Sequence, residues 1–138
     1  MLDGRVSELE LGAVLLAYRM KGETSAELAA MLDAAHRSFE PLHVQEGREH
    51  ARPVSIPSYN GARKQPNLTP LLALMLAREG VPVLVHGVVD DPGRVTSSEI
   101  FTELGIPHAQ SHDEIEDNLA SRRLAFVPVS VLTPKRGC

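Results

Sequence analysis

The residues best suited to bind an anion lie in one polar segment, residues 57 to 70. It follows a β-branched run and precedes an apolar stretch with helical spacing, so it is expected to connect a strand to a helix. Its two cations, Arg63 and Lys64, can pair with phosphate oxygens. Thr69 is a suitable N-cap and Pro70 a suitable first residue of the helix, whose N-terminus favours anions. We therefore predict an anion site. The simpler interpretation is a surface connection capped by Thr69.

Other side chains near this segment extend the predicted site. The ring of Tyr59 can stack on a base or sugar, or pack against the sheet edge. Asn60 and Gly61 are typical of a turn. His86 is expected at a strand end, where a histidine is either structural or a contact to phosphate or ribose. The predicted ligand or phosphate contacts are Ser58, Tyr59, Asn60, Gly61, Arg63, Lys64, Asn67, Thr69, His86 and Gly87.

Several function classes find no support in the 138 residues. The chain has no phosphate-binding Walker motif, no dinucleotide-binding glycine pattern and no zinc spacing. We assign no catalytic residue, no metal ligand and no cofactor. A net charge of −4 disfavours a strongly basic nucleic-acid module, although a local basic patch remains compatible with it. The one cysteine, Cys138, excludes a disulfide framework and favours the cytoplasm, and no apolar run suits a membrane span.

The first third of the chain is predicted to form two helices, over residues 7–20 and 25–39. Each begins with a capping box, Ser7 with Glu10 and Thr24 with Glu27. The short connection between them indicates an αα-hairpin. A hairpin of this kind cannot bury both apolar faces by itself. A partner surface is therefore expected, from the same chain or from a second copy.

Residues 40 to 51 are polar and read as a linker, after which strands alternate with helices. The predicted strands are 54–56, 82–85 and 124–127, and the predicted helices are 70–79, 96–104 and 112–121. Short, continuously apolar strands alternating with helices indicate a parallel sheet covered on both faces. Ligand-binding loops are then expected beyond the carboxyl ends of the strands, at 57–69, 86–95 and 128–134.

Specific segments carry a family resemblance. Residues 12–24 (GAVLLAYRMKGET) resemble the N-terminal helical domain of anthranilate phosphoribosyltransferases, and Asn67-Leu68-Thr69 followed by His86-Gly87 keeps that family's order. The residues 56–65 (IPSYNGARKQ), 67–72 (NLTPLL) and 85–87 (VHG) are similar to the YbiB-type paralogues, which include DNA-binding proteins.

The resemblance implies a fold and an assembly. It implies an α/β fold in which a small helical segment, residues 1–45, precedes a parallel-sheet domain of the anthranilate phosphoribosyltransferase (nucleoside phosphorylase-like) type, residues 46–138. It also implies a homodimer formed through the helical segment. Relative to the family, the first helices and everything after about the third strand are expected to be missing.

Departures from the family pattern bear on the chemistry. Where the transferases have a Gly-Thr-Gly-Gly-Asp turn that approaches pyrophosphate, this chain has Pro57-Ser58-Tyr59-Asn60-Gly61. The family's lysine before His-Gly is Val85, and its magnesium-binding acids lie mainly in the missing part. The leading hypothesis is a non-catalytic, YbiB-like protein that binds nucleic acid or a phosphate anion. The alternatives are phosphoribosyl transfer from phosphoribosyl pyrophosphate with magnesium, or an inactive fragment.

Overall fold

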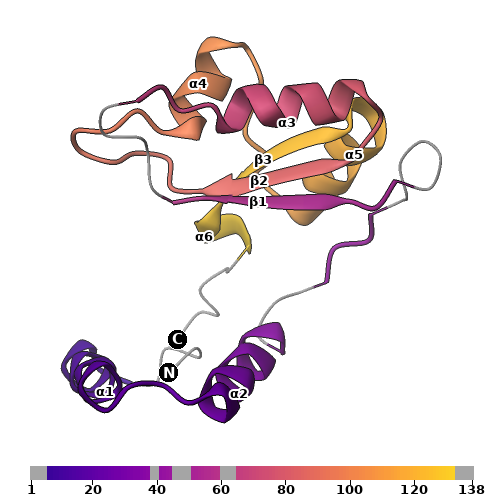
Figure 1. Cartoon of the computed structure of the whole chain (residues 1–138). Helices are drawn as coiled ribbons and strands as arrows, with labels where there is room; N and C mark the ends of the chain where they lie inside the picture. The colour runs from indigo at the N-terminus through magenta and orange to yellow at the C-terminus, as the bar shows by residue number, and fades with distance from the viewer. Residues whose placement is uncertain (1–5, 38–40, 45–50, 60–64, 133–138) are drawn as a thin grey trace. The chain divides into compact units, whose positions relative to one another are not determined.

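The computed structural model describes residues 6–37, 41–44, 51–59 and 65–132 (Figure 1). The described residues up to Pro41 form one compact unit, and Leu42–Leu132 form a second. The first unit holds two helices, and the second holds a three-stranded sheet with helices. Each unit is described by itself.

The helical unit consists of α1 (Glu8–Lys21) and α2 (Ser25–His36). Both predicted capping boxes are confirmed: the N–H of Glu10 donates to Ser7 Oγ at 3.3 Å, and the N–H of Glu27 donates to Thr24 Oγ1 at 3.3 Å. The predicted end of the second helix falls partly on residues 38–40, outside the described residues.

The apolar side chains of the helical unit are exposed. No residue of α1 or α2 is buried, and Leu9 and Met20 are 84% and 80% exposed. Leu16, between them on the same helix, is 61% exposed. The partner surface expected from the sequence therefore stays a prediction.

The second unit is built on a parallel sheet in the order β1-β2-β3, which confirms the predicted α/β fold class (Figure 1). Its strands are β1 (Val54–Ser58), β2 (Val83–Gly87) and β3 (Leu124–Pro128). Its helices are α3 (Thr69–Arg78), α4 (Ser97–Glu103), α5 (His112–Arg122) and the short α6 (Val129–Leu132). The prediction of a loop over 128–134 is wrong for α6, because the chain turns into a helix directly after β3.

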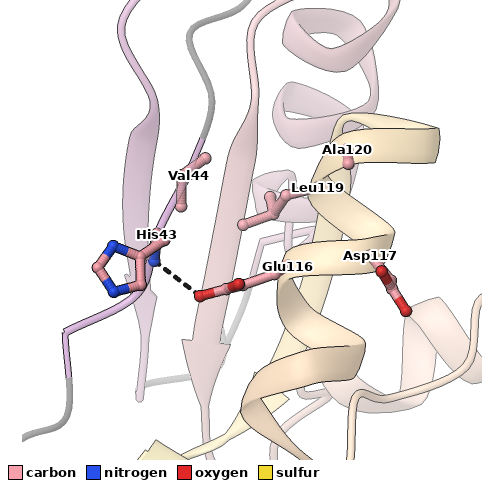
Figure 2. A pocket seen from close by; sticks show the side chains of 6 residues that line it. All are labelled: His43, Val44, Glu116, Asp117, Leu119 and Ala120. Carbon is pink, nitrogen blue, oxygen red and sulfur yellow. Dashed lines mark hydrogen bonds between the residues drawn. The ribbon is translucent and has the colours of Figure 1, made fainter.

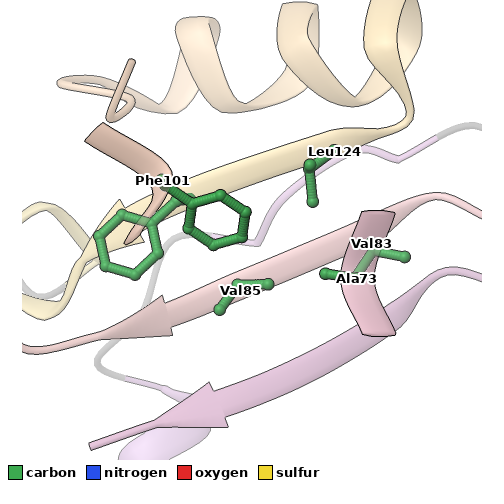
Figure 3. Packing of buried hydrophobic residues seen from close by; sticks show 6 residues of the cluster. Ala73, Val83, Val85, Phe101 and Leu124 are labelled. Carbon is green, nitrogen blue, oxygen red and sulfur yellow. The ribbon is translucent and has the colours of Figure 1, made fainter. Parts of the chain in front are cut away.

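Two apolar clusters cover the two faces of the sheet. On one face, α3 and α4 pack against the strands through Ala73, Val83, Val85, Phe101, Leu124 and Phe126 (Figure 3). On the other face, α5 packs through Ala109, Ile115, Leu119, Ala125 and Val127. Strand β3 supplies alternate residues to each cluster, and all five of its residues are buried. This two-sided burial explains why β3 reads as a continuous apolar run.

Part of the predicted linker belongs to the second unit and packs within it. Leu42 and Val44 contact the apolar cluster beneath α5, and the N–H of His43 donates to a carboxylate oxygen of Glu116 at 2.7 Å. The linker prediction is therefore wrong for residues 42–44. Local composition indicated a polar connection, but it carried no information about a contact with a helix far along the sequence, a separation of 73 between His43 and Glu116.

Candidate functional site

The predicted site residues on the first two strands lie at one edge of the sheet. Pro57 pairs with His86, and Ser58 pairs with Gly87, so β1 and β2 end side by side. Tyr59 follows directly after β1. Because the strands are parallel, their carboxyl ends and the loops that leave them share this edge. The structure thus brings together the residues at the end of each strand.

Gly87 is required at this edge by packing. A Cβ added to residue 87 would lie 2.0 Å from the carbonyl oxygen of Ser58. This separation is far below a tolerable contact, and the obstacle is backbone rather than a flexible side chain. The sequence indicated Gly87 as a ligand contact. The structure supplies a structural reason for glycine, because only a residue without a side chain lets β1 and β2 pair to their last residues.

Tyr59 and His86 form a polar aromatic pair. The phenol oxygen lies 2.8 Å from His86 Nδ1, and the rings meet edge to face with centroids 5.4 Å apart. Burial lowers the pKa of His86 and raises the pKa of Tyr59. Both groups are therefore neutral at neutral pH, so the pair offers ring surface and hydrogen bonds rather than positive charge.

Asn67 connects three segments through its side-chain amide. Its Nδ2 donates to the carbonyl of Val95 at 3.2 Å and to Ser97 Oγ at 3.1 Å. Its Oδ1 accepts the N–H of Thr69 at 3.2 Å. Both amide protons are thus used inside the protein. Ser58 joins the same group, because its hydroxyl lies 2.6 Å from that of Ser97.

The prediction that Thr69 is the N-cap is wrong. Helix α3 begins at Thr69, and its N-cap is Leu68, which makes no side-chain capping bond. Leu68 already has right-handed helical backbone angles, with φ −89° and ψ 0°. The side chain of Asn67 takes the capping role by accepting the first helical N–H, so Pro70 falls one position later than predicted.

Sequence reasoning missed Ser97, which bonds to both Ser58 and Asn67. The available signal was the hydroxyl run Thr96-Ser97-Ser98 followed by Glu99, which marks a capped helix after the β2 loop. In the structure Thr96 is that cap, with the N–H of Glu99 donating to Thr96 Oγ1 at 3.2 Å. Nothing in the local pattern indicated that Ser97 reaches β1.

Four predicted contacts, Asn60, Gly61, Arg63 and Lys64, lie outside the described residues. Within the described ranges, no group of three or more histidine, cysteine, aspartate or glutamate residues is arranged to hold a metal ion. No helix among them is long and apolar enough to cross a bilayer.

A shallow hollow of about 190 Å³ lies elsewhere in the second unit, between residues 43–44 and α5. Its lining residues are His43, Val44, Glu116, Asp117, Leu119 and Ala120 (Figure 2). The hydrogen bond from the His43 backbone to Glu116 crosses it. The hollow shares no residue with the predicted site.

Comparisons with known proteins show which proteins this chain is similar to. Residues 1–39 match the helical bundle domain of a glycosyl transferase family. The chain is 44% identical, over 97% of its length, to the uncharacterized protein YbiB of Escherichia coli (strain K12), and it covers 41% of that protein.

Anthranilate phosphoribosyltransferases also match this chain. The anthranilate phosphoribosyltransferase of Thermus thermophilus is 29% identical over 97% of the chain, which covers 40% of that enzyme. The crystal structure of anthranilate phosphoribosyltransferase (TrpD) from Thermus thermophilus superposes with a TM-score of 0.71 at 26% identity, over 97% of this chain and 40% of that one.

These matches confirm that the chain is related in sequence and fold to the anthranilate phosphoribosyltransferase superfamily, with its helical segment of the glycosyl transferase helical-bundle type. Among these relatives, YbiB shares the higher identity. The chain spans about two fifths of the length of each.

We expect Gly87→Ala to destabilise the protein by about 1–3 kcal/mol, because the added methyl group forces the ends of β1 and β2 apart. The measurement is the free energy of unfolding in urea. Gly12→Ala is the matched control: a Cβ there meets nothing within 4 Å, and alanine favours the helix by about 0.5–1 kcal/mol. Equal stability of Gly87→Ala and wild type would contradict the packing argument.

We also expect the imidazole of His86 to titrate with a pKa below the ordinary value of 6.5, because burial penalises its charged form. The unfolded state then binds the proton more readily, so stability falls as the pH drops from 6.5 towards the lowered pKa. NMR titration measures the pKa. The difference in unfolding free energy between wild type and His86→Gln, followed over that window, isolates the contribution of His86. The free energy of unfolding of the wild type minus that of His86→Gln should decrease as the pH falls. An increase would contradict the prediction.

Proposed function

We propose that this chain is a non-catalytic, YbiB-like member of the superfamily that binds nucleic acid, or a related phosphate anion, at the carboxyl edge of β1 and β2. The observation that carries the proposal is the pairing of β1 through Ser58. Where the transferases have a glycine turn, Pro57 and Ser58 stay in the sheet, paired with His86 and Gly87. The bulky ring of Tyr59 comes next, packed edge to face on His86.

This arrangement argues against a pyrophosphate cradle. A cradle needs backbone N–H groups that a phosphate can approach closely, which glycine permits. Pro57 has no N–H, and the end of the strand is held against Gly87. Without the cradle, the described residues of this edge offer no set of backbone N–H groups to stabilise the charge that develops on a departing pyrophosphate. These residues therefore favour binding without transfer.

The available contacts suit a flexible polyanion. Tyr59 is 39% exposed, so part of its ring can stack on an unpaired base. Arg63 and Lys64 follow in the same loop and supply the positive charge that Tyr59 and the neutral His86 lack. Since the chain carries a net charge of −4, attraction must be local and therefore weakened strongly by salt.

We expect labelled single-stranded oligonucleotide to bind with an affinity that falls steeply with salt, as measured by fluorescence anisotropy. The double variant Arg63→Ala/Lys64→Ala should weaken binding similarly for every sequence and lower the salt slope by roughly 1 to 1.5, about 0.7 for each lost phosphate contact. Arg78→Ala/Arg122→Ala, which removes two helix-borne cations, is the matched control and should leave the slope unchanged. Absence of binding at low salt would refute the nucleic-acid proposal.

Phosphoribosyl transfer is the second candidate, because Asn67, Thr69, His86 and Gly87 match the family's positions. It requires binding of phosphoribosyl pyrophosphate with magnesium. Calorimetric titration with that ligand separates the two functions: heat that depends on magnesium supports the transferase, and a flat titration removes it. A protein that binds neither ligand is the inert fragment of the third hypothesis.

We further propose that two copies associate through α1 and α2, because their apolar residues are exposed within the helical unit. Leu16→Glu should convert a dimer into a monomer in sedimentation equilibrium, since a carboxylate cannot be buried without a partner. Leu104→Glu, at an exposed leucine that ends α4, is the matched control and should remain dimeric. A wild-type protein that is monomeric at high concentration would refute this assembly.

A further inference from the structure

One buried hydroxyl group holds both ends of the loop that carries Tyr59 and the two cations. The loop spans residues 59–66, with Ser58 before it and Asn67 after it. Ser97 Oγ lies 2.6 Å from Ser58 Oγ and accepts a hydrogen bond from Asn67 Nδ2 at 3.1 Å. Ser97 is 1% exposed, so its bond to Ser58 is buried away from water, and its bond to Asn67 is partly buried.

Ser97 is itself fixed in place by its own helix. It is the first residue of α4, and the preceding Thr96 forms a complete capping box with Glu99. The N–H of Thr96 donates to Glu99 Oε2 at 2.7 Å, and its hydroxyl also lies 3.2 Å from the carbonyl of Val89. The position of the Ser97 hydroxyl is therefore set by α4, and the two loop ends form hydrogen bonds to it.

The attachment extends to the start of α3. Asn67 binds Ser97 and the carbonyl of Val95 through its two amide protons, and its oxygen accepts the N–H of Thr69. With both protons used internally, Asn67 has no side-chain N–H left for a ligand. Its role in this arrangement is to fix where the loop ends and α3 begins.

We propose that Ser97 is a positioning residue: through Ser58 and Asn67, its hydroxyl sets the separation and orientation of the two ends of the 59–66 loop. The consequence for binding rests on the proposed function, because a loop with fixed ends loses less entropy when it binds a ligand. The structural part of the proposal stands apart from any ligand and is tested separately.

The test compares Ser97→Ala with Ser98→Ala. Ser98 is the matched control, since it is buried at the same end of α4 but bonds to His108 rather than to the loop ends. Hydrogen exchange of the Thr69 amide, followed by NMR, reports on Asn67, which accepts that N–H. We expect Ser97→Ala to raise this exchange rate roughly three- to tenfold, the effect of weakening one hydrogen bond, while Ser98→Ala leaves it near wild type.

A double variant distinguishes the loss of the Ser97 hydrogen bonds from a general loss of stability. Ser97→Ala leaves the buried hydroxyl of Ser58 without a partner, whereas Ser58→Ala/Ser97→Ala removes both groups and should recover part of the stability. The Thr69 amide should still exchange fast in the double variant, because Asn67 has lost the same attachment. Equal Thr69 exchange in wild type and the double variant, or equal acceleration by Ser97→Ala and Ser98→Ala, would overturn the proposal.

Affinity for the single-stranded oligonucleotide provides the functional readout. We expect Ser97→Ala and the double variant to bind several-fold more weakly, with Ser98→Ala unchanged. If wild type binds no oligonucleotide, the proposed function fails while the exchange experiment still decides the role of Ser97. If oligonucleotide binds but Ser97→Ala binds as tightly as wild type, the link from loop position to affinity is refuted.

Discussion

The carbonyl group of Ser58 occupies the space that a side chain at residue 87 would need, and the arrangement of the whole edge depends on this contact. Because Gly87 has no side chain, β1 can pair with β2 to the last residue of each strand. Ser58 is thereby brought within hydrogen-bonding distance of Ser97, and Tyr59 is brought against His86. Gly87 was predicted from the sequence as a ligand contact, but in the structure it is needed for the two strands to pair at their ends.

Elements with strong local patterns were predictable from the sequence, whereas strand ends were not. The capping boxes at Ser7 and Thr24 located the first two helices. The apolar runs of the alternating strands and helices located the other major elements among the described residues. The first strand was nevertheless predicted to stop at Ile56, one residue before Pro57. Strand β1 lies at the edge of the sheet, where a residue without an N–H is tolerated, so it continues to Ser58.

The candidate site was predictable in its position but not in its internal connections. That strand ends meet at one edge follows from parallel pairing, and this predicted the loops 57–69 and 86–95 at the same edge of the sheet. The bonds of Ser97 to residues 39 and 30 positions earlier follow only from how α4 packs beside β1, which no local pattern encodes. The same limitation applies to Thr69: its suitability as a cap was evident, but Asn67 competes for that role two residues earlier.

The hydrogen bonds of this edge divide its polar residues into two kinds. Ser58, Asn67 and Ser97 bond to one another and to backbone, so their polarity serves to fix the chain. Tyr59 and His86 bond to each other near the surface and remain neutral, so they offer a surface for stacking without charge. In the proposed function, Arg63 and Lys64 supply the positive charge for an anion at this edge, and in the sequence they lie between Ser58 and Asn67 of the first group. In that proposal, a neutral aromatic pair beside two cations suits a ligand recognised by its repeating phosphates, because such a ligand needs local charge and a stacking surface more than a closed pocket.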